Sequence, residues 1–108
     1  MEIVFHAHHA EVSEHMRRLA ERKVRLAGLR VPRVVEATIR FEEDGPTRRV
    51  SVALRAAKHH ELIGHGEGRY FGPALTTAIN HVLAQASRET KVATRSVARR
   101  AARDRSRA

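Results

Sequence analysis

The chain has 108 residues, of which 42% are hydrophobic and 31% charged, and its 21 Lys and Arg against 12 Asp and Glu give a formal net charge of +9. This length suits one domain with a single modest core. The absence of cysteine excludes disulfides, thiolate zinc sites and cysteine nucleophiles. The sequence shows no secretory leader and no apolar run long enough for a membrane span, so we expect a cytoplasmic protein without a membrane partner.

The excess of basic residues is the strongest indication of function. A pI near 11.5 in a small domain is typical of proteins that bind a polyanion, most often nucleic acid and less often an anionic membrane. Arginine outnumbers lysine, and its planar guanidinium suits bidentate contacts with phosphate. Aromatic residues make up only 4%, which argues against an aromatic base-stacking platform. A surface that is basic only for solubility is the alternative.

The first 32 residues predict a strand followed by a helix. Side chains alternate over Glu2–Ala7, as in a strand. A helix is then expected to begin near Glu11–Ser13 and to end at Gly28, before Pro32. Lys23 falls in the middle of its apolar stripe, where a lysine usually buries its stem and carries the ammonium to the edge; a directed phosphate contact is the alternative. The stripe comprises Val12, Met16, Leu19, Ala20, Leu26 and Ala27.

The middle of the chain has the pattern of a three-stranded meander. Asp44-Gly45, inside a turn expected at residues 42–47, is the strongest hairpin signal. Gly64 and Gly66 interrupt the last and weakest strand, and their segment GHGEG superficially resembles a phosphate-binding loop without the downstream Lys-Ser/Thr. The strands are expected at Val34–Phe41, with Val35, Ala37, Ile39 and Phe41 on one face, at Arg48–Ala57 and, after a turn at Lys58–His60, at Glu61–Glu67.

A second long helix is predicted from Pro73, which suits a first turn and follows Gly72. The order β-α-β-β-β-α favours an α+β sandwich in which a four-stranded sheet carries both helices on one face. We expect the domain to cover residues 1–98 and a basic, disordered tail to cover residues 99–108. The expected buried stripe of the second helix comprises Leu75, Ala78, Ile79, Val82, Ala86, Ala93 and Val97.

Basic residues recur on the expected outer faces of both helices. A solvated helix face usually mixes charge signs at i,i+4 steps, whereas these faces are mainly positive, which favours polyanion binding. If the helices lie side by side, their outer faces and the groove between them form one cationic surface. The residues are Arg18, Arg22 and Arg25 on the first helix and Arg88, Lys91, Arg95 and Arg99 on the second.

Four histidines near the N-terminus raise the question of a metal site. The segment VFHAHHAEVSEHM lacks the His-Glu-x-x-His spacing of a helical zinc site. An open site from His8, His9, Glu11 and His15 is a minor alternative to a polar loop with solvent-facing strand positions. No catalytic constellation is evident, so we expect neither an enzyme nor a cofactor.

Two segments carry a resemblance to a known family. The first, MEIVFHAHHAEVSEHMRRLAERKVRLAG, has Glu11-Val12-Ser13 before Met16-Arg17, then Lys23 and Leu26. The second, GHGEGRYFGPALTTAINHVLAQASRETK, has Glu67-Gly68, Ala74-Leu75, Ile79, Gln85 and Arg88. In this order the chain resembles the ribosome hibernation-promoting factor family, which includes the ribosome-associated inhibitor A proteins, over about residues 1–95. It departs from the family pattern at Ala7, Tyr70, Gly72 and Thr76, as a short and divergent form would.

The resemblance implies a protein that docks in the small ribosomal subunit in stasis or stress. It would occupy the channel of messenger RNA and of the A- and P-site transfer RNAs and block initiation sterically. It would use no small-molecule substrate and would be monomeric away from the ribosome. Position in the family pattern favours Arg17, Lys23, Arg88 and Lys91 as contacts with ribosomal RNA, whereas Arg18, Arg22, Arg25, Arg95 and Arg99 rest on the helical-face argument. Two alternatives stay open: a general nucleic-acid-binding protein, and a histidine-dependent metal enzyme that acts on RNA.

Overall fold

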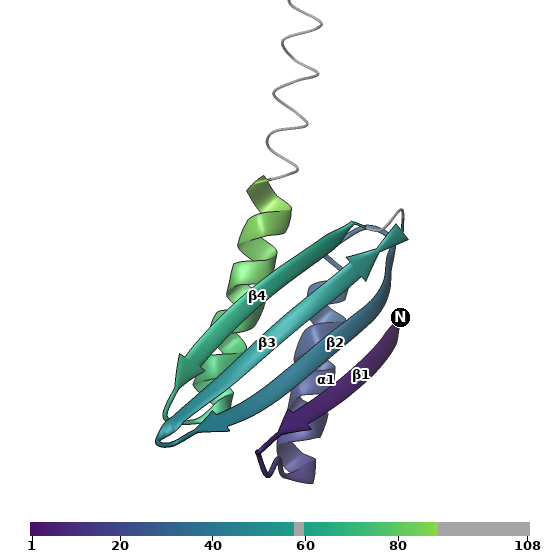
Figure 1. The fold of residues 1–108 in the computed structure, drawn as a ribbon. Helices are drawn as coiled ribbons and strands as arrows, with labels where there is room; N and C mark the ends of the chain where they lie inside the picture. Colours follow the sequence, from purple (N-terminus) through teal and green to yellow (C-terminus); the bar gives the residue numbers. More distant parts are fainter. Residues whose placement is uncertain (58–59, 89–108) are drawn as a thin grey trace, which may run out of the picture.

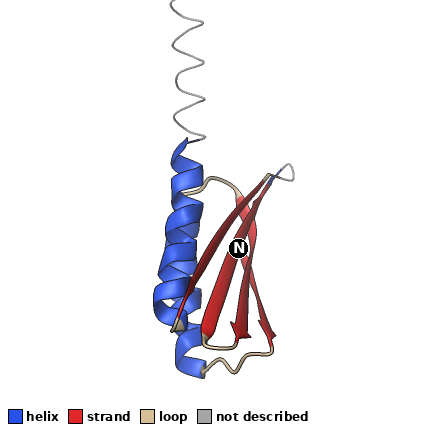
Figure 2. Ribbon diagram, turned by 60° about the vertical axis from the view of Figure 1, so that its left-hand side comes forward, coloured by secondary structure: helices blue, strands red, loops and turns tan. Residues whose placement is uncertain are grey.

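A β-α-β unit, a three-stranded meander and a second helix make up the computed structural model, which describes residues 1–57 and 60–88 (Figure 1). Both helices lie on the same face of the sheet, so the molecule has two layers (Figure 2). The predicted α+β class and the order β-α-β-β-β-α are confirmed. The elements are β1 (Glu2–His8), α1 (Glu14–Gly28), β2 (Val34–Asp44), β3 (Thr47–Ala56), β4 (Glu61–Gly68) and a second helix that includes residues 71–88.

The strands follow one another across the sheet in chain order, β1-β2-β3-β4. β1 pairs parallel to β2, with α1 as the crossover that a parallel pair requires, and the other two pairs are antiparallel. Asp44 pairs with Thr47, and Gly45 between them has a φ of 59°. The turn expected over residues 42–47 is therefore shorter than predicted, because Glu42 and Glu43 continue β2.

Local signals define both ends of α1. The Ser13 hydroxyl oxygen accepts a hydrogen bond from the Met16 amide at 3.1 Å, and Glu14 places a carboxylate in the first turn, near the positive end of the helix dipole. The helix ends at Gly28, as predicted. Its C-cap, Leu29, keeps a right-handed conformation, and the residue that adopts a left-handed conformation before β2 is Arg33, with a φ of 62°.

The core lies between the sheet and the two helices, and two predictions about it are wrong. Leu26 was expected in the apolar stripe of α1 but is 65% exposed, while Val24 is fully buried in that stripe. Val35 is exposed because a bulge between Val34 and Glu36 gives β2 an extra residue, and Val34 packs against the core instead. The largest fully buried side chains are Phe41, Ile39, Leu54, Leu75, Val24, Val50, Val52 and Val82.

Gly64 and Gly66 lie inside β4 and do not form a phosphate-binding loop. Both face the second helix, and a Cβ atom at Gly64 would overlap the carbonyl oxygen of Ala78. A Cβ atom at Gly66 would overlap the carbonyl oxygen of Ala74 in the same way. The two glycines therefore let the backbone of the second helix approach the backbone of β4.

The outer edge of β4 is closed by the side chain of Gln85 from the second helix. The Ile63 amide donates to Gln85 Oε1 at 3.1 Å, and Gln85 Nε2 donates to the Ile63 carbonyl oxygen at 2.7 Å. These bonds satisfy backbone groups that an edge strand would otherwise expose.

Several predictions concern residues 58–59 and 89–108, which lie outside the described residues. They include most of the turn at Lys58–His60, the end of the second helix and the basic tail. Within the described residues, neither helix has the length and apolar composition needed to cross a bilayer.

Candidate nucleic-acid interface

Three arginines lie on the outer side of α1. Arg18, Arg22 and Arg25 are exposed, whereas Ala20 and Val24 are buried. At about 100° per residue, the three arginines fall within roughly 60° of one another on the side opposite the buried residues. This placement agrees with the helical-face argument.

Arg17 and Lys23 do not share that outer side. They are six residues apart and so lie about 120° from each other around the helix axis, with the buried stripe between them. Lys23 is half-buried and reaches the second helix, where its Nζ donates to Thr76 Oγ1 at 3.1 Å. Its partner is a neutral hydroxyl, so this contact leaves the positive charge of Lys23 uncompensated.

A groove with a volume of about 420 Å³ separates α1 from the second helix. Lys23 and Arg30 bring positive charge to it, and Thr76 and Asn80 bring neutral polar groups. No carboxylate lies among its lining residues, which otherwise are Leu26, Ala27, Ile79 and Leu83. The groove between the helices therefore carries positive charge, but none of the outer-face arginines Arg18, Arg22, Arg25 and Arg88 lines it.

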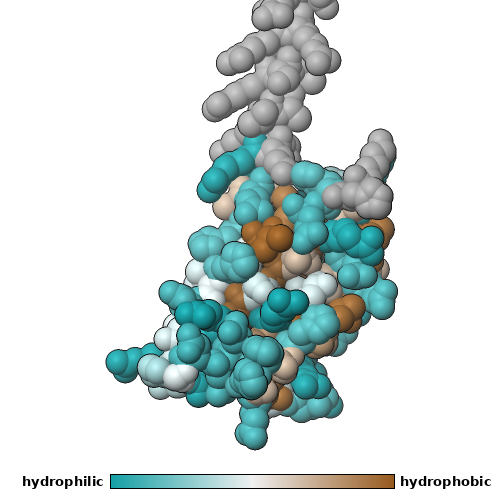
Figure 3. All heavy atoms as spheres, in the orientation of Figure 1, coloured by the Kyte–Doolittle hydropathy of each residue, from teal (hydrophilic) through white to brown (hydrophobic). Residues whose placement is uncertain are grey.

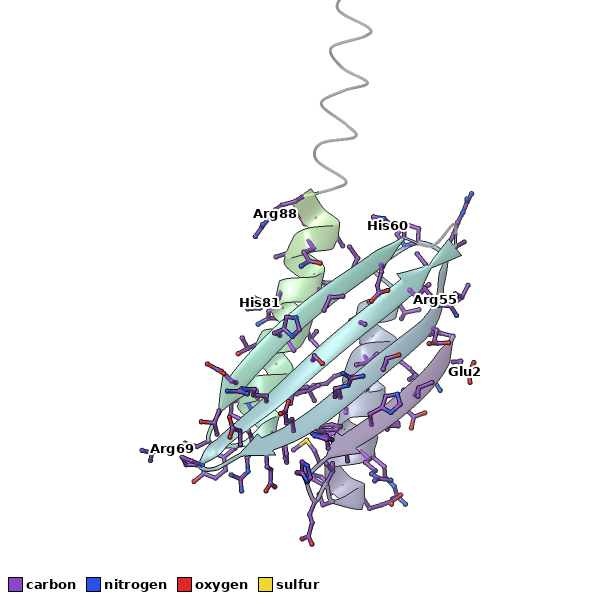
Figure 4. The ribbon with its side chains drawn as sticks, in the orientation of Figure 1. Glu2, Arg55, His60, Arg69, His81 and Arg88 are labelled. Atoms are coloured by element: carbon purple, nitrogen blue, oxygen red, sulfur yellow. The ribbon has the colours of Figure 1, made fainter. Side chains whose placement is uncertain are left out.

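Arg88 lies apart from this groove. Its side chain projects from the side of the second helix that faces away from α1, the side on which His81 also lies (Figure 4). The structure therefore does not bring Arg88 together with the cations of α1. Lys91, Arg95 and Arg99 lie outside the described residues.

Ion pairs divide the cations of α1 into two groups. Arg18 pairs with Glu14 at 3.5 Å, and Arg25 pairs with Glu21 at 3.0 Å. Both are exposed i,i+4 pairs, which contribute little to stability and are screened by salt. By contrast, neither Arg17 nor Arg22 has a carboxylate partner within residues 1–57 and 60–88.

The sheet balances most of its own charge. Its open face, turned away from the helices, is largely hydrophilic (Figure 3). Among the arginines of the strands, only Arg40 lacks a carboxylate partner within the described residues. The excess positive charge of the described fold therefore lies on the helices and on the turns that adjoin them. The pairs are Arg48 with Glu43 at 3.7 Å, Arg49 with Asp44 at 3.2 Å and with Glu67 at 3.3 Å, and Arg55 with Glu36 at 3.1 Å.

Of the four N-terminal histidines, His6 and His8 lie in β1, His9 in the loop that follows, and His15 in the first turn of α1. The rings of His8 and His9 meet edge to face, with centroids 4.2 Å apart. In the described part of the chain, no three His, Cys, Asp or Glu side chains group closely enough to hold a metal ion.

Sequence reasoning missed Arg30 and Asn80 as groove residues. Arg30 follows the end of α1, outside any helical pattern, and Asn80 is a single polar residue beside the apolar stripe of the second helix. Only the positive charge of Arg30 could have pointed to it as a groove residue.

The fold defines a class of small two-layer α+β domains with a chain-ordered four-stranded sheet and a basic helix layer. A ribosomal subunit interface protein from Coxiella burnetii has this fold, with a TM-score of 0.73 at 15% identity over 84% of this chain and 99% of that one. The N-terminal domain of Thermus thermophilus Protein Y gives a TM-score of 0.71 at 16% identity over 82% of this chain and 98% of the other.

These two neighbours confirm at the level of the fold the resemblance that the sequence suggested, and at such identities the fold is what they share with this chain. No family model matches the sequence, and no curated protein matches it significantly.

Proposed function

We propose that this chain is a ribosome-binding translation inhibitor of the hibernation-promoting factor family. It docks on the small ribosomal subunit through its basic helix layer and contacts ribosomal RNA. It acts without catalysis, because its bulk occupies the path of messenger RNA and of the A- and P-site transfer RNAs. An idle ribosome that holds it cannot initiate.

The uneven distribution of charge carries this proposal. The strands pair all of their arginines except Arg40 with carboxylates, whereas Arg17, Arg22 and Lys23 on α1 have none within the described residues. Unpaired guanidinium and ammonium groups on one layer attract phosphates and orient the molecule as it approaches RNA. The name of the Coxiella protein, a ribosomal subunit interface protein with the same fold, supports the ribosome as the source of that RNA.

The proposed contacts form three positions on the helix layer. Arg17, Arg18, Arg22 and Arg25 extend around the exposed part of α1, and Lys23 lies in the groove beside Thr76. Arg88, on the side of the second helix that faces away from α1, forms the third. Lys91, Arg95 and Arg99 are proposed contacts as well and lie outside the described residues. Because these positions point in different directions, we expect the helix layer to lie between several RNA segments and not against one RNA strand alone.

Co-sedimentation with purified small subunits at low salt tests the proposal. We expect the wild-type chain to migrate with the subunits and to reduce their binding of messenger RNA. The double variant Arg17→Glu/Arg22→Glu should lose this binding, because it replaces two unpaired cations of α1 with repelling charges. The triple variant Arg88→Glu/Lys91→Glu/Arg95→Glu tests the second helix in the same way.

The variant Arg40→Glu/Arg69→Glu is the matched control for the α1 double variant. It changes the net charge equally and also replaces arginines without carboxylate partners in the described residues, but it leaves both helices unaltered. We expect it to keep most of the binding. Equal losses in the two double variants would show that only net charge matters and would contradict a defined interface on the helix layer.

A general nucleic-acid-binding protein is the second candidate, because the same unpaired cations would serve it. Competition with bulk RNA separates the two. A ribosome-specific factor stays on the subunits in the presence of excess unrelated RNA, and a general binder is displaced from them.

A further inference from the structure

An apolar hollow lies at the end of α1, where the chain turns into β2. Its volume is about 810 Å³, and Met1, Leu26, Leu29, Val31 and Pro32 contribute most of its apolar lining. Leu26 is 65% exposed and Leu29 is 83% exposed. Single exposed aliphatic residues are ordinary on protein surfaces, whereas several around one hollow mark a contact surface. We call this feature the α1–β2 hollow.

The composition of the hollow fits a protein partner better than a nucleobase. Bases that leave their stack are held by aromatic rings or by guanidinium planes; the α1–β2 hollow has arginines but no aromatic ring on its lining, and its apolar residues are aliphatic. Leu26 and Leu29 also lie outside the core that α1 forms through Ala20, Val24 and Ala27. Their aliphatic side chains are suited to aliphatic side chains of another protein.

The rim of the hollow is positively charged. Arg22, Arg25 and Arg33 lie on its lining, and no carboxylate does. Glu21 pairs with Arg25 at 3.0 Å, but Arg22 and Arg33 have no carboxylate partner within residues 1–57 and 60–88. Charge complementarity therefore favours an anionic partner, and beside an aliphatic lining the anions that fit are carboxylates of a protein.

The backbone at one of these arginines is constrained. Arg33 has a φ of 62°, a left-handed conformation that glycine and asparagine adopt far more readily than arginine. Its carbonyl oxygen accepts a hydrogen bond from the Ala57 amide at 2.9 Å, which ties the turn to the end of β3. The rim thus holds a guanidinium group on a constrained turn.

We infer that the α1–β2 hollow binds an acidic protein segment that carries an exposed aliphatic side chain. The aliphatic side chain enters the hollow between Leu26 and Leu29, and flanking carboxylates pair with Arg33 and, on molecules that are not bound to RNA, with Arg22, which is also a proposed RNA contact. A second copy of this chain fits less well, because a two-fold contact would set these arginines against their own copies. A flat lipid surface would leave the concave floor unfilled.

A random peptide library displayed on phage tests this inference with the full chain as the immobilised target. We expect the selected peptides to share two or more Asp or Glu residues next to Leu, Ile or Met. One selected peptide is then synthesised with a fluorophore, and its Kd is measured by anisotropy. The variant Leu29→Gln/Arg33→Asn should weaken its binding at least tenfold, and asparagine keeps the left-handed turn accessible.

The variant Tyr70→Gln/Arg69→Asn is the matched control. It also removes one highly exposed large side chain and one arginine, at the opposite end of the molecule (Figure 4). Its affinity for the peptide should stay within twofold of that of the wild type.

Four results would overturn the inference. The first is selected peptides without carboxylates, and the second is equal peptide binding by the Leu29→Gln/Arg33→Asn variant and the wild type. The third is a tenfold loss of affinity of this variant for a 12-nucleotide uridine-rich RNA, which would make the hollow part of the RNA surface. The fourth is a wild-type dimer in sedimentation equilibrium that this variant abolishes. None of these measurements requires binding to ribosomal subunits. Failure of the proposed function would appear only in the co-sedimentation experiment, so the two failures can be told apart.

Discussion

Gly64 and Gly66 determine how closely the second helix approaches the sheet. Both point toward carbonyl oxygens of that helix, at Ala78 and Ala74, and neither position has room for a methyl group. Gly68, at the end of the same strand, has open space where a Cβ atom would lie. Gly68 therefore tolerates a larger side chain, whereas Gly64, four residues earlier, does not.

We expect Gly64→Ala to lower the free energy of unfolding by about 1–3 kcal/mol, the usual cost of overpacking a filled core. The helix backbone has to move to admit the methyl group. Gly68→Ala should stay within about 0.5 kcal/mol of the wild type, because its methyl group meets nothing. Urea denaturation followed by circular dichroism measures both, and equal effects of the two substitutions would contradict the close contact between β4 and the second helix.

Sequence patterns predicted the type and order of the elements but not these contacts. Periodicity identified both helices and all four strands because each element buries one face. In the sequence the same glycines look like a weakness of β4, since the atoms they accommodate belong to residues eight or more positions further along the chain. Val35 was misplaced because a bulge shifts the alternation of a strand without leaving a mark in the sequence.

At the scale of elements, Gln85 joins the second helix to the edge of β4. Its amide both accepts from the Ile63 amide and donates to the Ile63 carbonyl oxygen. Ile63 itself is 40% exposed, so without Gln85 a partly apolar strand edge would face solvent. Such an edge can pair with another chain.

Gln85→Ala should lower the free energy of unfolding by about 1–2 kcal/mol, the net contribution of two hydrogen bonds. Hydrogen exchange at the Ile63 amide should become faster by at least tenfold. Asn80→Ala is the control, because it removes from the same helix an exposed side-chain amide that has no hydrogen bond among the described residues. Unchanged exchange at Ile63 in Gln85→Ala would show that this edge is protected in another way.

The positions of the basic residues along each helix could be predicted from the sequence, but their ion pairs and the relative placement of the two helices could not. Helical spacing placed Arg18, Arg22 and Arg25 correctly on the outer side of α1. It could not show that Arg18 and Arg25 pair with Glu14 and Glu21, because rotamers decide whether an i,i+4 pair forms. Nor could it place Arg88 relative to α1, since that depends on how the two helices lie on the sheet.

At the scale of the whole molecule, charge is divided between the two layers. Within the described residues, the strands pair all of their arginines except Arg40 with carboxylates, and the other cations without carboxylate partners lie on the helices and in the turns that adjoin them. Such a division makes association with RNA depend strongly on ionic strength.

Binding to small subunits should therefore weaken steeply with salt. With about six to eight phosphates neutralised, a plot of log K against log salt should have a slope of about −4 to −7. Arg17→Glu/Arg22→Glu should make the slope shallower by about 2, one for each lost contact, and Arg40→Glu/Arg69→Glu should leave it near the wild-type value. Fluorescence titration between 50 and about 300 mM KCl provides the slope, and a value near zero would contradict phosphate contacts as the basis of binding.

The order of strands in the sheet has a consequence for synthesis of the chain. Each strand after β1 pairs with the strand that precedes it in the sequence, so its partner has already been translated when it leaves the exit tunnel. Contacts between neighbours in sequence also favour rapid folding. The sheet can thus grow one strand at a time from β1, and Gln85, translated after all four strands, closes the last edge of the nascent domain.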